Sequence, residues 1–265
     1  MLTSALVMAL VQISGDSLQA QRLGNSPLSI NIHSIIDRTF VLLPKIPDDS
    51  YWNPDIALHS FIVISLVAAF VHYPFLTALA RLRRFLWLFG LGYFFRMLCL
   101  AGTIMPPSNP TCVPIERGIV ESILMTPALL FGFIHTCTDK IFSGHTIVAI
   151  LIMWSWIGAR IEASDPWYSP WFIYPVAHTF FMICTSVMGW NHYTVDIVVA
   201  IIVNSLTYWL YRSLLHIYHI YGSCKPGSSH TNVRHASTIA KAIGWLDGAD
   251  LAAEPEHTVS MVEAV

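Results

Sequence analysis

The chain has 265 residues, of which 55% are hydrophobic and only 11% are charged. A soluble globular domain carries about 25% charged residues, and a charge placed in hydrocarbon costs free energy, so this composition indicates a polytopic membrane protein. The net charge of −2 argues against nucleic-acid binding, which needs a basic surface.

Five stretches of the chain are long and apolar enough to cross a membrane, which takes about 20 residues in a helix. In chain order they are residues 56–80, 85–105, 143–161, 171–189 and 195–218. The sequence therefore predicts an all-α fold, a polytopic membrane bundle of about six transmembrane helices if one further segment also crosses.

Two further stretches are apolar but ambiguous. Residues 2–13 are few for an ordinary span, and they fit a short first span, the remnant of one, or a segment at the membrane interface. Residues 118–135 contain Glu121, Pro127 and Gly132, which favours a re-entrant or interfacial helix.

These patterns divide the chain into three parts. Residues 1–43 form an N-terminal segment with a weak or short first span, and residues 44–221 form the multi-span domain. Residues 222–265 are polar and show no spanning pattern, which predicts a mostly disordered cytosolic tail.

Basic residues near the ends of the spans indicate the orientation, because cytoplasmic loops are rich in Lys and Arg. Arg81, Arg83 and Arg84 crowd the predicted link between the first two spans, which places that link in the cytosol. By alternation Arg212 is cytosolic as well, and the third and fifth spans begin on the opposite face of the membrane.

A polar motif stands where each of those two spans begins. The first covers residues 137–146, with the sequence CTDKIFSGHT, and the second covers residues 192–196, with the sequence HYTVD. A helix N-terminus offers free backbone N–H groups and a positive dipole end, which suit a phosphate group. Ser143 is placed to cap its helix, and Gly144 permits a ligand to approach the backbone closely.

The second motif also suggests a nucleophile. His192 and Asp196 are four residues apart, so they share one face if both lie on a helix. A carboxylate there holds the imidazole in one tautomer and stabilises its charged form. We infer that His192 attacks phosphorus, and that His145 protonates the leaving oxygen and then acts as base. Asp139 is a candidate to tune His145 or to orient the acceptor.

Either motif alone is more often a surface or capping feature than a site. Both together, at matching ends of two spans, favour catalysis, because ionisable residues at membrane depth are usually functional. The other histidines are expected to be packing, interfacial or tail residues. The cysteines show no metal-type spacing. Cys112 and Cys137 lie on the same predicted side of the membrane, but a disulfide between them is not expected.

The motifs follow a known pattern. Residues 137–146 match Cys-Gly-Asp-x3-Ser-Gly-His-Thr except that Thr138 replaces glycine, and residues 192–197 match His-Tyr-Thr/Ser-x-Asp-Val with Ile197 for valine. A third motif, Arg-Arg-x8-Tyr-x2-Arg-x6-Thr, is present in full at Arg83, Arg84, Tyr93, Arg96 and Thr103. A fourth, Pro-Pro-Leu-Pro-Asp, is only echoed at residues 44–48. In these motifs the chain resembles the sphingomyelin synthase and sphingolipid synthase group of the lipid phosphate phosphatase superfamily.

The resemblance covers residues 44–212 and implies six spans, an active site on the luminal or extracellular face, and no metal or other cofactor. It also implies a catalytic triad formed by His145, His192 and Asp196. For Arg96, a structural ion pair and a substrate contact stand as equal alternatives. The candidate substrate-binding residues are Asp139, Ser143, Gly144, Tyr193 and Arg96.

The activity that the resemblance implies is that of a ceramide phosphotransferase, of the sphingomyelin synthase or inositol phosphorylceramide synthase type. Such an enzyme moves a phospho-head group from a glycerophospholipid to ceramide through a phosphohistidine and releases diacylglycerol. Its partners would be membrane lipids, and its location the Golgi, the plasma membrane or both. The head group is open between phosphocholine and phosphoinositol, with phosphoethanolamine less favoured, and a homo-oligomer is left open.

Three alternative functions fit parts of this pattern. A lipid phosphate phosphatase usually carries Lys-x6-Arg-Pro and an arginine shortly before the second histidine, whereas residues 188–191 here read MGWN. A phosphatidylcholine:diacylglycerol cholinephosphotransferase would use diacylglycerol as acceptor, and Cys137 and Asp139 favour ceramide instead. A transporter or scaffold with a relic site would tend to show paired halves or to lack one triad residue, and the sequence shows neither feature.

Overall fold

The computed structural model describes residues 7, 10–15, 17, 37–47, 53–103, 105, 108, 120–121, 123–125, 136–137, 141–162, 164 and 166–222. Within these ranges the regular structure is helical and no strand occurs, which confirms the predicted all-α class. The main helices are α2 (Arg38–Leu42), α3 (Pro54–His72), α4 (Phe75–Gly102), α6 (Gly144–Glu162), α7 (Pro170–Met188) and α8 (Thr194–Gly222).

Five of these helices, α3, α4, α6, α7 and α8, are long and apolar enough to cross a membrane. They correspond to the five predicted spans, so the chain is an integral membrane protein with several crossing helices. In the two ambiguous stretches, residues 7, 10–13, 120–121 and 123–125 are helical, and so are residues 14, 15 and 17 just after the first stretch. The rest of those stretches and the tail 223–265 lie outside the described residues, so a short first span, a re-entrant helix and a disordered tail stay predictions.

The boundary between the first two spans was predicted wrongly. Helix α3 ends at His72, and Tyr73 is extended, with φ −125° and ψ 149°. The cause is Pro74, because the residue before a proline is disfavoured in the α region. Helix α4 therefore begins at Phe75, and the arginines expected in a link at 81–84 lie inside the first turns of α4.

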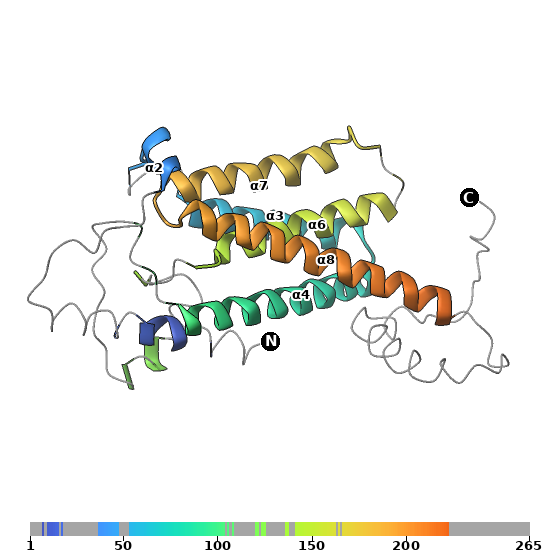
Figure 1. The fold of residues 1–265 in the computed structure, drawn as a ribbon. Coiled ribbons are helices and arrows are strands. Elements are labelled where there is room, and N and C mark those ends of the chain that lie inside the picture. The colour runs from blue at the N-terminus through green and yellow to red at the C-terminus, as the bar shows by residue number, and fades with distance from the viewer. Residues whose placement is uncertain are drawn as a thin grey trace, which may run out of the picture.

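Helix α6 is the centre of the bundle. It contacts α3, α4, α7 and α8, and Figure 1 shows these helices running side by side. Its residues Ile147, Ala149 and Leu151 are fully buried. By contrast, apolar side chains of α3 and α4 such as Val67 and Trp87 are exposed, as expected for side chains that face lipid. The core thus fixes α6, and with it the first histidine motif.

An ion cluster joins three helices at the end of α6 remote from that motif. Glu162 pairs with Arg81 at 3.3 Å and with Arg84 at 3.8 Å, both on α4, and also with Arg212 on α8. These groups are only partly exposed, at 19 to 37% of their side-chain surface. The predicted cytosolic arginines are therefore gathered at one end of the bundle, and both histidine motifs lie at the other.

Candidate active site

The first histidine motif forms the N-terminus of α6. Phe142 has a positive φ of 63°, which turns the chain into the helix. The Ser143 hydroxyl then accepts hydrogen bonds from the Thr146 N–H at 3.3 Å and from the Thr146 hydroxyl at 3.0 Å. Ser143 is fully buried. Its predicted capping role is confirmed, and this cap places His145 in the first turn of α6.

The second motif forms the N-terminus of α8. His192 precedes the helix, which begins at Thr194, so His192 and Asp196 do not share a helical face as predicted. They meet because the Asp196 carboxylate turns back to accept a hydrogen bond from the Tyr193 N–H at 3.0 Å. The same oxygen, Oδ2, lies 3.9 Å from His192 Nδ1, which is an ion-pair distance and longer than a hydrogen bond. Both side chains are almost completely buried.

The structure brings the two motifs together, as the sequence predicted. The rings of His145 and His192 have their centroids 5.9 Å apart, at an interplanar angle of 65°. The Ser143 N–H also donates a hydrogen bond of 3.3 Å to the main-chain oxygen of Asp196. The starts of α6 and α8 are thus joined through their backbones, and two imidazoles lie edge to face at one end of the bundle.

The third motif, on α4, reaches the same place. The Arg96 guanidinium and the Tyr93 hydroxyl pack against Gly144, and a Cβ added at Gly144 would lie 3.0 Å from Arg96 Cζ and 3.2 Å from the Tyr93 oxygen. Arg96 is 3% exposed. Gly144 is therefore needed for close approach, but the group that approaches it in the structure is this guanidinium. A buried positive charge stands beside the start of α6.

Asp55 is a site residue that the sequence analysis missed. Its Oδ1 lies 2.7 Å from His145 Nε2, a hydrogen bond between α3 and α6. Asp55 occupies the first turn of α3, where Asn53 is the N-cap and accepts a hydrogen bond from the Asp55 N–H at 2.8 Å. The sequence Asn-Pro-Asp is an ordinary helix start. The one feature of the sequence that could have indicated a role for Asp55 in the site was its predicted position at the same membrane face as both histidine motifs.

A carboxylate from α2 caps α8. The Thr194 N–H donates to Asp37 Oδ2 at 2.5 Å, and the Thr194 hydroxyl donates to Asp37 Oδ1 at 3.0 Å. Thr39 also donates to Asp37 from its N–H and its hydroxyl. Burial raises the pKa of the Asp37 carboxyl, but these hydrogen bonds outweigh burial, so the pKa lies below its ordinary value of 3.8. Asp37 thus steadies the helix end that carries Asp196.

The predicted substrate contact Tyr193 has a packing role in the structure. Its side chain is 1% exposed, and its ring stacks on Phe40 of α2 with centroids 5.7 Å apart. Phe40 stacks on Trp190 as well, at 5.2 Å. Helix α2 therefore covers the loop between α7 and α8 that presents His192, and Figure 1 shows it at that end of the bundle.

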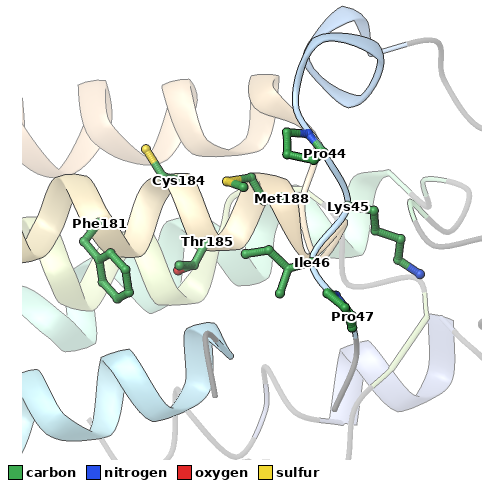
Figure 2. Close-up of a pocket in the computed structure, with 8 residues that line it drawn as sticks. All are labelled: Pro44, Lys45, Ile46, Pro47, Phe181, Cys184, Thr185 and Met188. Carbon is green, nitrogen blue, oxygen red and sulfur yellow. The ribbon is translucent and has the colours of Figure 1, made fainter. Parts of the chain in front are cut away.

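An apolar cavity of about 420 Å³ lies beside the site (Figure 2). It separates the end of α7 from the segment after α2, and the Ile46 N–H holds that segment to the Met188 carbonyl at 2.9 Å. The lining residues are Pro44, Lys45, Ile46, Pro47, Phe181, Cys184, Thr185 and Met188. None of the predicted catalytic residues lines it.

Two predictions concern the segment before Ser143. Asp139 lies outside the described residues, so its expected role is untested. Cys137 is disulfide-bonded; its partner lies outside the described residues, so whether Cys112 pairs with it stays untested. The spacing of cysteines along the sequence does not show how close two cysteines in loops lie in space. The bond ties down the start of the first histidine motif.

Part of the chain is similar to known proteins. Residues 136–213 match the family PAP2 superfamily C-terminal. The chain is 29% identical over 157 residues to a putative phosphatidylcholine:ceramide cholinephosphotransferase 3 of Caenorhabditis elegans. The aligned region covers 53% of this chain and 41% of that protein. It is also 30% identical over 138 residues to a phosphatidylinositol:ceramide inositolphosphotransferase of Leishmania major. That aligned region covers 47% of this chain and 37% of that protein.

The chain thus matches only about two fifths of the length of these curated relatives. The family match contains His145, His192 and Asp196 and extends over α6, α7 and most of α8. These findings support the resemblance that the motifs carried: residues 136–213 match the PAP2 superfamily C-terminal family, and the chain is similar to a phosphatidylcholine:ceramide cholinephosphotransferase and a phosphatidylinositol:ceramide inositolphosphotransferase.

Proposed function

We propose that the chain is a ceramide phosphotransferase, which moves a phospho-head group from a glycerophospholipid to ceramide and releases diacylglycerol. The observation that carries the proposal is the meeting of His145 and His192, 5.9 Å apart, at one end of a membrane bundle. A relay of a phosphoryl group between two lipids needs both a nucleophile and an acid–base group within reach of one phosphorus atom. The names of both relatives support ceramide as the acceptor.

The reaction runs in two displacements. His192 attacks the donor phosphorus, a P–N bond forms, and the P–O bond to diacylglycerol breaks while His145 protonates the departing oxygen. A ceramide hydroxyl then attacks the phosphohistidine. His145 accepts the hydroxyl proton, the new P–O bond forms, and the P–N bond breaks to regenerate His192. Asp196, within 4 Å of His192 Nδ1, favours the positive charge that develops on this ring.

Positive charge at the site suits the phosphodiester. The buried Arg96 guanidinium stands at the start of α6, and the N-termini of α6 and α8 meet through the Ser143–Asp196 backbone hydrogen bond. Helix N-termini and guanidinium groups both stabilise phosphoryl oxygens, most strongly where water is excluded. We therefore assign Arg96 to the phosphate, in preference to a purely structural ion pair.

The site is proposed to face the lumen or the extracellular space, in the Golgi or the plasma membrane. Two observations support that side. Cys137, a few residues before His145, is disulfide-bonded, and disulfides persist in oxidising compartments. Arg81, Arg84 and Arg212 gather at the opposite end of the bundle, where a cytosolic surface would carry basic residues.

The PAP2 superfamily match also favours a second candidate, a lipid phosphate phosphatase in which water replaces ceramide. Trp190 and Asn191 stand before His192 where such enzymes usually have an arginine. A phosphomonoester carries more negative charge than a phosphodiester, so the missing cation favours the phosphodiester donor.

The experiment that tests the proposal is a transfer assay on membranes of cells that lack this activity and express the chain. Fluorescent ceramide is offered with phosphatidylcholine, phosphatidylinositol and phosphatidylethanolamine in turn. We expect a polar ceramide product with one of the first two donors. His216→Ala, an exposed histidine near the far end of α8, should leave the product unchanged. Phosphate release from phosphatidic acid, without any ceramide product, would support the phosphatase instead.

A further inference from the structure

We propose that Asp55 is the positioning residue of His145, so that the site contains two carboxylate–imidazole pairs, one for each histidine. This inference rests on the proposed function, because it assigns a task to Asp55 within the same two-step transfer. Neither the motifs nor the relatives' names point to Asp55, which lies on α3, before the residues that match the PAP2 family.

Asp55 lies closer to His145 than Asp196 lies to His192. Its Oδ1 is 2.7 Å from His145 Nε2, whereas Asp196 Oδ2 is 3.9 Å from His192 Nδ1. The first distance is that of a charge-assisted hydrogen bond. The second is too long for a hydrogen bond and is that of an ion pair. The Asp55 and His145 side chains are 25% and 20% exposed, so this pair is partly shielded from solvent.

Asp55 is held firmly by its own helix. Asn53 caps the first turn of α3, and Pro54 fixes φ at the first position. Two residues after Asp55, the Ala57 carbonyl lies 2.9 Å from His178 Nε2 of α7, and the His178 ring stacks on Phe61 with centroids 4.3 Å apart. The start of α3, and with it the backbone of Asp55, is thus fixed against α7.

The hydrogen bond determines which nitrogen of His145 reacts. With Nε2 held by Asp55, Nδ1 is the atom that gives a proton to the diacylglycerol oxygen and later takes one from ceramide. The Asp55 carboxylate stabilises the His145 imidazolium, which exists before the proton is given to the diacylglycerol oxygen and again after a proton is taken from ceramide. An alkoxide is a poor leaving group, so its departure depends on this proton; a leaving group that is stable as an anion does not need it.

That difference supplies the test. The variant Asp55→Asn keeps the shape and removes the charge, and it is compared on the natural donor and on the p-nitrophenyl ester of the same phospho-head group. We expect kcat with the natural donor to fall by about 10²-fold, with KM little changed. The first-turnover burst of p-nitrophenolate should stay close to that of the unsubstituted protein. His145→Ala should show the same selectivity for the leaving group, and Asp55→Glu should restore part of the natural-donor rate.

Two outcomes would overturn the inference, and a third would bear on the proposed function alone. A burst that falls in parallel with the natural-donor rate would mean that Asp55 only maintains the structure, and it would overturn the inference. Unchanged turnover of the natural donor in Asp55→Asn would overturn it as well. If the unsubstituted protein consumes donor but makes no ceramide product, the proposed acceptor is wrong, and the leaving-group comparison, read on diacylglycerol release, still tests Asp55.

Discussion

The guanidinium of Arg96 occupies the space that a side chain at position 144 would need. A Cβ on Gly144 would lie 3.0 Å from Arg96 Cζ and closer still to Nη1. This contact joins the arginine motif of α4 to the first histidine motif, and it explains why a glycine precedes His145. Backbone and guanidinium approach one another at the point where we place the phosphate.

Gly144→Ala should therefore damage catalysis more than folding. The added methyl group must displace the Arg96 guanidinium, and misplacement by about 1 Å of a group that positions a substrate costs about 10²-fold in rate. Gly102→Ala is the matched control, because a Cβ at Gly102 meets nothing within 4 Å among the described residues. The measurement is head-group transfer together with thermal unfolding in detergent. Equal activity of the two variants would contradict the close packing of Arg96.

His192→Ala should abolish transfer while the protein is still made and inserted. The ring is buried beside Asp196 but makes its proposed contribution through one nucleophilic nitrogen. Transfer activity per amount of folded protein is the quantity to compare, with His216→Ala as the control. Turnover that survives the loss of His192 would remove the nucleophile assignment.

Asp37→Ala should destabilise the protein by about 1 kcal/mol at neutral pH, because it removes an N-terminal cap of α8. The pKa of Asp37 is lower in the folded protein than its ordinary value of 3.8. Its contribution to stability is therefore complete above pH 3.8 and is lost as the pH falls through the lower, folded-state pKa. We expect the Tm difference between the two proteins to narrow below about pH 4. A difference that does not depend on pH would show that the Asp37 charge is not the cap.

Gly158→Ala tests the crossing of α6 and α8 far from the site. A Cβ at Gly158 would collide with the Tyr208 hydroxyl, while the Tyr208 Cζ atom would be at an ordinary 3.4 Å. Such overpacking costs about 1–3 kcal/mol, so Tm should fall with little loss of specific activity. Adding Tyr208→Phe removes the colliding oxygen and should recover much of that loss. Equal Tm values for the single and the double variant would contradict this reading of the contact.

The span pattern was predictable because hydrophobicity reports burial in lipid directly, and the histidine pair was predictable because both motifs open helices at one face. The end of the first span was not predictable from hydrophobicity, because the apolar composition continues past Pro74. Only the backbone restriction of Tyr73, the residue before Pro74, breaks the helix. Long hydrophobic stretches thus indicate how many helices cross more reliably than where each one ends.

Asp55 could not be predicted from local sequence for a different reason. In Asn53-Pro54-Asp55, an acidic residue in the first turn is already explained by the helix dipole. Its contact with His145 spans 90 residues of chain and depends on how α3 packs against α6 and α7. The disulfide at Cys137 is likewise a matter of distance in space. Pairings between distant segments are what the structure adds.

The measurement that tests the central claim most directly is the capture of the covalent intermediate. The purified protein is mixed with a donor labelled in its phospho-head group, without ceramide, and is then chased with ceramide. We predict acid-labile label on His192, absent from His192→Ala, that passes to ceramide during the chase while diacylglycerol has already been released. A protein that releases no diacylglycerol before ceramide is added, and never carries label, would contradict the two-step relay through His192.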